Sequence, residues 1–380
     1  MNFNYTEEQE MLRDTLQRFI AKDYTFNRRK AIANSPLGYS PEHWQTLAEL
    51  GVLGISFPES YGGIGGNAVD TMLVMEGIGQ GLVLEPYMAT VVLCGQLILH
   101  SDDQRHQATL LPAIASGALL MALAHYENGG RFDAGTMETV ARRDGFGYVL
   151  NGGKSFVLHG KQADRYIVSA RTRGEVCDPE GISLFLVDKE SEGVHIREYA
   201  MQDGQRAAEI SFHDVKVKSK SLLGVEHLAW PVLEQALDAA MAALCAEAVG
   251  AMQVLHQITL DYVKTRKQFG ATLGSFQVVQ HRLVDMFIAI EQARSMAILA
   301  SVHVSLPDRI ERRRTMSAAK VLIGQAARYV GQQAVQLHGG MGMTDELNVS
   351  HYFKRLTVIN LMFGDADHHL GQFSDLMLAA

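Results

Sequence analysis

The sequence is poor in the residues that mark secreted, disulfide-stabilised proteins. Its 380 residues include only three cysteines, an odd number, far apart at Cys94, Cys177 and Cys245. Scattered cysteines argue against a disulfide framework and favour a reducing compartment. The first residues have neither the basic segment nor the apolar run of a signal peptide, so we expect a cytoplasmic protein.

Long runs of one charge are also missing. The formal net charge is -8, and acidic and basic residues are interspersed along the chain. A nucleic-acid-binding surface usually appears as a cluster of Lys and Arg, so we expect no nucleic-acid partner. The most apolar run, residues 232–255, contains Glu234, Asp238 and Glu247. These acids indicate a buried helix of a soluble bundle, and we expect no membrane span.

Three successive patterns predict a mainly α protein with a middle β-domain (α+β). Apolar residues at helical spacing fill residues 1–118, which we interpret as an N-terminal α-helical domain. Alternating and β-branched runs, separated by turns such as Asp144-Gly145, predict an antiparallel β-domain over residues 119–224. Four long helical patterns then predict a C-terminal four-helix bundle over residues 225–380.

A short segment between the first two bundle helices has unusual chemistry. The helical pattern through Tyr262 stops near Gly270, and the next helix is expected from Ser275. Between them, Arg266 offers a planar fork of donors suited to phosphate, and Phe269 offers a flat apolar face. On spacing alone, a solvated turn whose phenylalanine fills the core explains the segment equally well.

Several segments resemble the acyl-CoA dehydrogenase family of flavoproteins, and together they cover nearly the whole chain. The most specific are Arg266-Lys-Gln-Phe-Gly270 and Gln336-x-x-Gly-Gly340, on consecutive bundle helices. Their joint presence is far more specific than either segment alone. The other matching segments are Phe57-Pro-Glu-Ser-Tyr-Gly-Gly63, Asn151-Gly-Gly-Lys154, Asp214-Val-Lys-Val217 and Leu223-Gly224.

The resemblance implies an FAD-dependent oxidoreductase that desaturates an acyl-CoA thioester between its α and β carbons. In the family the β-hydride passes to flavin N5 while a carboxylate removes the α-proton, and electrons then pass to an electron-transferring flavoprotein. The FAD lies at a dimer interface, where a neighbouring subunit grips its pyrophosphate and adenine. Carried over residue by residue, that lent grip consists of Arg266, Phe269, Gln277, Gln336, Gly339 and Gly340. The two glycines can also be a helix C-cap, and both interpretations can hold.

The residues with which a subunit serves its own flavin depart from the family pattern. The motif Thr-Glu-Pro-x-x-Gly-Ser-Asp corresponds to residues 125–133, which lack the proline and the Thr-Glu pair. The motif Trp-Ile-Thr corresponds to Phe156-Val157-Leu158, so its hydroxyl is missing. In the segment Tyr-Glu-Gly-Thr, the catalytic glutamate corresponds to Gly364 and the threonine to Ala366.

Asp365 is then the remaining candidate for a catalytic base. It lies one position after the family's glutamate and is one methylene shorter. We expect it at a helix N-terminus, where the helix dipole stabilises the charged carboxylate and weakens it as a base, so a helix cap is favoured over catalysis. Some members carry the base on the first bundle helix, but no carboxylate near Met241 is expected to face the same way. A metal site on Asp365 and His369 is not expected, because no other segment has ligand spacing.

We therefore expect a subunit of a heteromeric acyl-CoA dehydrogenase that pairs with a homologous catalytic subunit, as an α2β2 tetramer, and supplies the trans half of that partner's FAD site. This organisation resembles that of the dehydrogenases acting on steroid side-chain CoA thioesters and of the two-subunit pimeloyl-CoA type, so a role in lipid or steroid catabolism is expected. Three alternatives stay open: a self-sufficient homotetramer using Asp365, a related flavin oxidase or monooxygenase, and a flavin-free scaffold. The sequence does not specify the acyl group.

Overall fold

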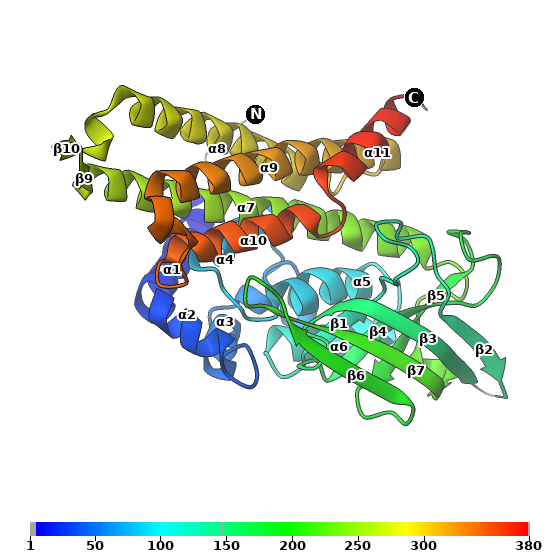
Figure 1. Cartoon of the computed structure of the whole chain (residues 1–380). Helices are drawn as coiled ribbons and strands as arrows, with labels where there is room; N and C mark the ends of the chain where they lie inside the picture. Colours follow the sequence, from blue (N-terminus) through cyan, green and yellow to red (C-terminus); the bar gives the residue numbers. More distant parts are fainter. Residues whose placement is uncertain (1–4, 146, 379–380) are drawn as a thin grey trace. The chain divides into compact units, whose positions relative to one another are not determined.

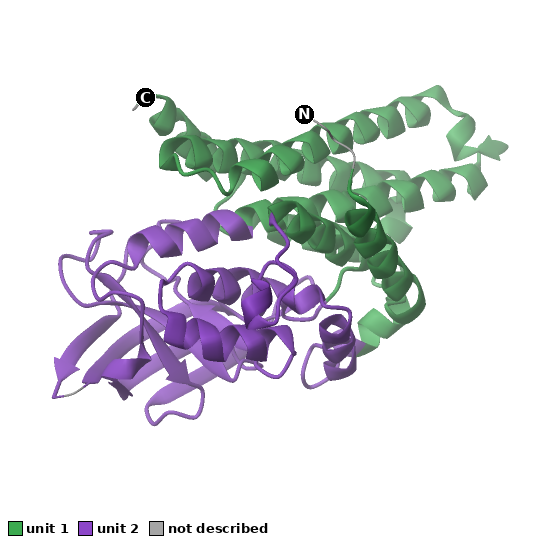
Figure 2. Ribbon diagram, turned by 180° about the vertical axis from the view of Figure 1, so that it is seen from behind, with its two compact units in different colours: residues 1–31, 68–83, 241–380 green, residues 32–67, 84–240 purple. Residues whose placement is uncertain are grey.

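The computed structural model describes residues 5–145 and 147–378, which form two compact units (Figure 1, Figure 2). Unit 1 consists of Met1–Ala31, Ala68–Val83 and Met241–Ala380, and unit 2 of Ile32–Asn67 and Leu84–Ala240. These limits cut across the three domains expected from the sequence, whose boundaries stay a prediction. The predicted order of helices, then strands, then a helical bundle is confirmed.

The C-terminal bundle occupies most of unit 1. Its helices are α7 (Trp230–Thr265), α8 (Gln277–His303), α9 (Arg309–His338), α10 (Asn348–Leu361) and α11 (Ala366–Leu378). Helix α9 packs against α8, α10 and α11. The helix limits agree with the periodicity of the sequence to within a few residues, because each long helix carries a regular apolar stripe.

Two N-terminal helices, α1 (Glu7–Asp23) and α4 (Ala68–Gly81), complete unit 1. Helix α4 crosses α7 at close range, since a Cβ at Gly79 would overlap the Glu247 carbonyl and a Cβ at Gly250 would overlap the Glu76 carbonyl. Only glycine permits the two backbones to approach this closely.

Helix α7 has the length and apolarity to cross a membrane, but 78% of its most apolar window is buried inside the structure. The three acids that we used to predict a buried helix, Glu234, Asp238 and Glu247, are themselves buried. Buried carboxylates are found where partners compensate their charge, which is a property of a protein core rather than of a lipid-facing helix. The predicted assignment of this run to the bundle is confirmed.

Unit 2 contains a β-sheet together with the shorter helices α3 (Pro41–Glu49), α5 (Gly95–Leu99) and α6 (Gln104–Ala115). A π-helix, Met88–Cys94, leads into α5, and α2 (Phe26–Ala33) joins the two units in the sequence. The start of α3 follows local rules: Ser40 caps the helix by accepting from the backbone N–H of His43, and Pro41 is its first residue.

The sheet follows the strand order β6-β7-β3-β2-β4-β5-β8, and β1 pairs with β4. The strands are β1 (Met121–Ala124), β2 (Val140–Asp144), β3 (Gly147–Leu158), β4 (Arg165–Arg171), β5 (Ile182–Asp188), β6 (Val194–Ala200), β7 (Arg206–Lys218) and β8 (Leu222–Leu223). The expectation of an antiparallel domain needs a correction at two pairings, because β1 and β2 each run parallel to β4. Turn residues predict hairpins well, but they carry no signal for such non-local pairing.

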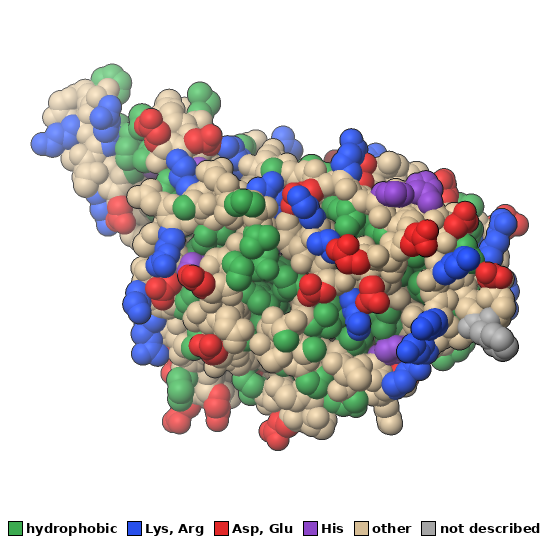
Figure 3. Space-filling view, turned by 90° about the horizontal axis from the view of Figure 1, so that it is seen from below, with side chains coloured by type: hydrophobic (Ala, Val, Ile, Leu, Met, Phe, Trp, Pro, Cys, Tyr) green, Lys and Arg blue, Asp and Glu red, His purple; other side chains and the backbone are tan. Residues whose placement is uncertain are grey.

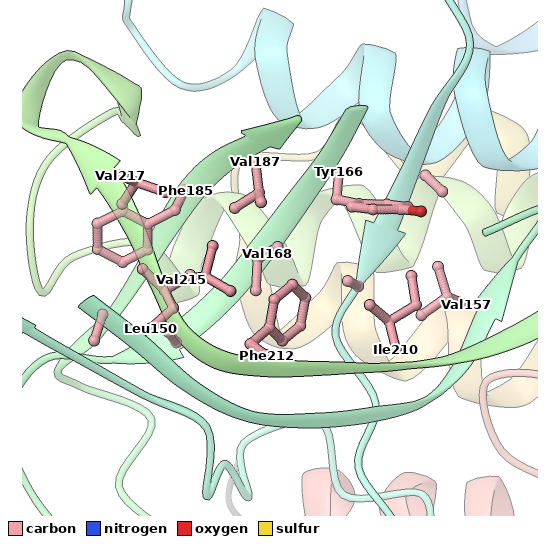
Figure 4. Packing of buried hydrophobic residues seen from close by; sticks show 14 of the residues in the cluster. Leu150, Val157, Tyr166, Val168, Phe185, Val187, Ile210, Phe212, Val215 and Val217 are labelled. Atoms are coloured by element: carbon pink, nitrogen blue, oxygen red, sulfur yellow. The ribbon is translucent and has the colours of Figure 1, made fainter. Parts of the chain in front are cut away.

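The sheet has its own apolar core, shown in Figure 4. Tyr166 and Phe185 from the central strands and Phe212 from β7 are fully buried there. On the face of the molecule drawn in Figure 3, acidic and basic side chains are interspersed. That face shows no broad basic surface, in agreement with the charge pattern of the sequence.

Candidate functional site

The connection between α7 and α8 is a small β-hairpin whose tip is aromatic. Strands β9 (Lys267–Gln268) and β10 (Ala271–Thr272) pair antiparallel, and Phe269 and Gly270 form the two-residue turn (Figure 1). Both turn residues have positive φ, 55° and 79°, as the type I′ hairpin turn requires. This backbone directs Phe269 outward, with 91% of its surface exposed. The alternative in which this phenylalanine fills the core is wrong.

Arg266 lies at the base of the same hairpin and is exposed. Its backbone is fixed on both sides, since its N–H donates to the Tyr262 carbonyl at 2.8 Å and its carbonyl accepts from Leu273 N–H at 2.8 Å. The ring of Phe276, at the entrance to α8, meets Phe269 edge-on with 6.3 Å between ring centres. The arginine and the aromatic face are thus presented on an ordered backbone, and Gln277 follows as the first residue of α8.

The second predicted segment lies at the end of α9. Gly339 is the C-cap of the helix with φ 60°, as the capping interpretation predicted. A Cβ added at Gly339 or Gly340 would have no described atom within 4 Å, beyond its chain neighbours. Both glycines therefore leave open space beside the backbone, which is the condition for a ligand to approach it closely.

The structure brings the ends of α7 and α9 together. The ring of Tyr262 stacks on the buried His338 with 4.3 Å between ring centres and 24° between planes. His338 Nδ1 donates to the Ala334 carbonyl at 2.9 Å, and burial holds the pKa of the imidazole below its usual value. The stack places the end of α7, which leads into the Arg266 segment, next to the Gln336–Gly340 segment.

The turn before α11 has a different character. Phe363 has φ 59° and Gly364 has φ 107°, a conformation that L side chains rarely adopt. Asp365 follows, and one of its carboxylate oxygens accepts from the backbone N–H of His368 at 2.9 Å. The carboxylate of Asp365 therefore caps α11, which was the favoured interpretation of this residue.

The segment that leads into this turn is held by Lys320, a residue that the sequence reasoning missed. Its buried ammonium donates to the carbonyls of Ile359 at 2.9 Å, Asn360 at 3.4 Å and Met362 at 2.8 Å. Burial lowers the pKa of Lys320 to about 8. A lysine inside an apolar helical run, Ser317-Ala-Ala-Lys-Val-Leu-Ile323, was the signal that could have identified it.

A bidentate ion pair supports α10, the helix that leads into this turn. Arg355 of α10 donates from Nε and Nη2 to the two carboxylate oxygens of Glu247, at 2.6 and 2.7 Å. Both side chains are buried. Both carboxylate oxygens of Glu247, which lies on the part of α7 that belongs to unit 1, are engaged by the guanidinium. Glu247 is therefore a structural partner rather than a free base.

The β-domain contains a second buried polar cluster at the first divergent motif. The ammonium of Lys154 donates to Glu127 Oε1 at 2.7 Å and to the His125 carbonyl at 3.0 Å, and Glu127 also accepts from the N–H of Thr139. Burial lowers the pKa of Lys154 to about 8, although Glu127 opposes this shift. Burial likewise lowers the pKa of His125 to about 3, with the charge of Lys154 adding to it. Glu127, within the stretch that corresponds to the first motif, is thus the ion-pair partner of Lys154.

Comparison with known proteins decides the family. Three models cover almost the whole chain: the acyl-CoA dehydrogenase N-terminal domain at residues 6–118, the middle domain at 122–215 and the C-terminal domain at 230–378. The short-chain-specific acyl-CoA dehydrogenase of Clostridium acetobutylicum is 30% identical over 97% of this chain and 97% of its own length. The chain belongs to the acyl-CoA dehydrogenase family.

Solved structures of acyl-CoA dehydrogenases agree with this assignment. Butyryl-CoA dehydrogenase of Megasphaera elsdenii is 26% identical with a TM-score of 0.90, and the match covers 100% of both chains. A steroid acyl-CoA dehydrogenase named for two components, Tcur3481 and Tcur3483, is 28% identical with a TM-score of 0.88 and covers 98% of both chains. The predicted fold and the predicted class, an oxidoreductase acting on CH–CH bonds, are confirmed.

FAD is the typical cofactor of acyl-CoA dehydrogenases, and the residues of this chain fit one part of it. The Arg266 fork, the outward Phe269 ring and the open backbone at Gly339 match the needs of a pyrophosphate and an adenine. When bound, FAD supplies the hydride-accepting chemistry. Position 364 itself is a glycine and provides no carboxylate, and the carboxylate of the adjacent Asp365 caps α11.

Proposed function

We propose that this chain is a subunit of a heteromeric, FAD-dependent acyl-CoA dehydrogenase that lacks its own catalytic base. Its homologous partner carries the base, and this chain lends Arg266, Phe269, Gln277, Gln336, Gly339 and Gly340 to the partner's FAD. The assembly is an α2β2 tetramer that desaturates an acyl-CoA and passes electrons to an electron-transferring flavoprotein. The cytoplasmic location expected from the cysteine content belongs to the same proposal.

One observation carries the proposal: Arg266 and Phe269, which we assign to the grip on the cofactor, are exposed, whereas the position of the base is occupied by a glycine in a closed turn. Desaturation needs a carboxylate within reach of the α-proton of the thioester, together with hydrogen-bond donors that polarise the carbonyl. A glycine at the position of the base cannot supply that carboxylate. The likeness to a steroid acyl-CoA dehydrogenase named for two components supports a two-chain assembly.

The first test is the colour of the purified protein. The chain expressed alone is expected to be colourless, and co-expression with a homologous catalytic subunit is expected to give a complex with flavin absorbance. A lone chain that is yellow and oxidises an acyl-CoA would contradict the proposal. A complex that stays colourless would favour a flavin-free scaffold.

Asp365→Asn separates the cap from catalysis. Asparagine caps helices about as well as aspartate, so the free energy of unfolding should change by less than about 0.5 kcal/mol. An amide cannot act as a base, however. We expect the turnover of the mixed complex to stay within about twofold of wild type, because the partner supplies the base. A loss of turnover with unchanged stability would instead assign catalysis to Asp365.

A further inference from the structure

The turn at Gly364 is closed by its surroundings as well as by its backbone. A Cβ on Gly364 would lie 2.6 Å from His368 Cδ2 and 2.8 Å from His369 Nε2, closer than real Cβ contacts. Of the two histidines, His368 is only partly buried, whereas His369 is 1% exposed. The buried ring of His369 therefore has less room to move away from a new side chain.

His369 contacts the residues on both sides of Gly364. Its Nε2–H donates to the Phe363 carbonyl at 2.9 Å, and its backbone N–H donates to the Asp365 carbonyl at 3.0 Å. On the far side of the ring, Nδ1 accepts from the Ser317 hydroxyl at 3.4 Å. Burial lowers the pKa of His369 to about 3, with the charge of Lys320 adding to the effect, so the ring is neutral and keeps one donor and one acceptor.

The chain that leads into the turn is fixed independently. Lys320 binds the carbonyls of Ile359, Asn360 and Met362, which is the last residue before the turn. The freedom that remains lies in the peptides around Phe363 and Gly364, and the contacts of His369 restrict those peptides. Two anchors on different helices thus hold one short segment.

We propose that His369 is a positioning residue that holds the Phe363–Gly364 turn in a conformation from which position 364 cannot present a carboxylate. This inference rests on the proposed function, because it concerns the turn that carries the glutamate in catalytic members. It adds that the absence of a base does not depend on the identity of residue 364 alone. A glutamate placed there would meet the His369 ring and a backbone unsuited to any side chain.

A double-mutant cycle on the full chain tests the proposal without any cofactor. Gly364→Ala should lower the Tm by at least about 4 °C, because strained backbone and overlap both act against the added methyl. In a His369→Ala background the turn is released, and the same substitution should lower the Tm by less than half as much. Gly145→Ala is the matched control, since Gly145 also has positive φ (56°) but no described atom within 4 Å of an added Cβ. Its cost should be equal in both backgrounds.

Equal costs of Gly364→Ala in both backgrounds would overturn the proposal. If His369→Ala does not fold, a crystal structure of Gly364→Ala decides instead. We expect the His369 ring to be displaced from the Phe363 carbonyl, and an unmoved ring with only His368 shifted would contradict the inference. His369→Gln should behave like wild type, because its amide can donate to the same carbonyl. All these measurements read the Tm or the crystal structure of the chain and need no flavin, so their outcome does not depend on the result of the colour test.

Discussion

The same dipeptide, Phe-Gly, occurs twice in unit 1 with positive φ at both residues, and its two copies differ in almost every other respect. At Phe269-Gly270 the aromatic ring projects outward, and a Cβ on the glycine would have no described atom within 4 Å. At Phe363-Gly364 the glycine is buried under two histidines. An unusual backbone at the hairpin thus exposes an aromatic side chain, whereas at the turn it leaves no room for a side chain at position 364. Local conformation alone does not indicate function, and the surroundings decide it.

The largest loss of stability is expected at the buried ion pair between Glu247 and Arg355, which supports the helix leading into the closed turn. Glu247→Ala leaves the buried guanidinium of Arg355 without its carboxylate and should cost about 3–5 kcal/mol of unfolding free energy, measured by chemical denaturation. The matched control replaces both partners by methionine, which should restore most of the loss because no buried charge remains. A double variant as unstable as the single one would show that packing, not charge, supports α10.

At the hairpin, Arg266→Ala should leave the stability of the lone chain within about 0.5 kcal/mol, because the residue is exposed. In the mixed complex it should weaken FAD binding roughly 10- to 150-fold, the value of a charge-assisted hydrogen bond to phosphate. The neighbouring exposed cation provides the control: Lys267→Ala should change FAD binding by less than about threefold. Equal effects of the two substitutions would reduce the role of Arg266 to general surface charge.

Lys320, which binds the segment before the Gly364 turn, should make the stability of the protein depend on pH. The pKa of Lys320 is about 8 in the folded protein, whereas the ordinary lysine value of 10.5 applies in the unfolded chain. Between pH 8 and pH 10.5 the unfolded chain therefore binds more protons than the folded protein. Stability attributable to this lysine should therefore rise by about 1–3 kcal/mol as pH increases from 8 to 10.5. The measurement compares wild type with Lys320→Met across that range, and a constant difference between them would contradict the assignment. Cys245 and Asp365 are the neighbouring acidic groups that oppose the shift.

The smallest effect is expected at the tip of the hairpin. Phe269→Ala should weaken FAD binding in the mixed complex about 2- to 12-fold, as expected for one aromatic stacking contact. Phe269→Leu should recover less than half of the loss, since it restores apolar area but not a flat face. Thermal unfolding of the lone chain should not change, because the ring is 91% exposed. A large drop in stability would show that the ring packs against its own chain.

Much of the fold could be predicted from the sequence because its signals are local. Thr6 and Gln9, three residues apart, form a capping box at the start of α1, and α8 begins at Gln277, close to the predicted Ser275. The cap formed by Asp365 also follows from local rules. By contrast, the parallel pairing of β1 with β4 joins residues more than forty positions apart, as in Met121 and Arg165, and leaves no local pattern.

The site could be predicted only in part for the same reason. The Arg266 and Gln336 segments were identified by resemblance, and the structure adds the Tyr262–His338 stack that links them. The positive φ of Phe363 could not be predicted, because phenylalanine has no intrinsic preference for that region. The role of His369 depends on a fold that places its ring next to a glycine five residues earlier.

The turn at Gly364 also has an evolutionary consequence. In an enzyme that has lost its base by a single substitution, one reversion restores activity, and selection can recover it. Here the backbone conformation and the buried His369 ring oppose a side chain at position 364, so a returning glutamate would be destabilising before it was useful. Several changes would have to occur together. Under the proposed function, such a subunit depends on its catalytic partner across generations, not only within one complex.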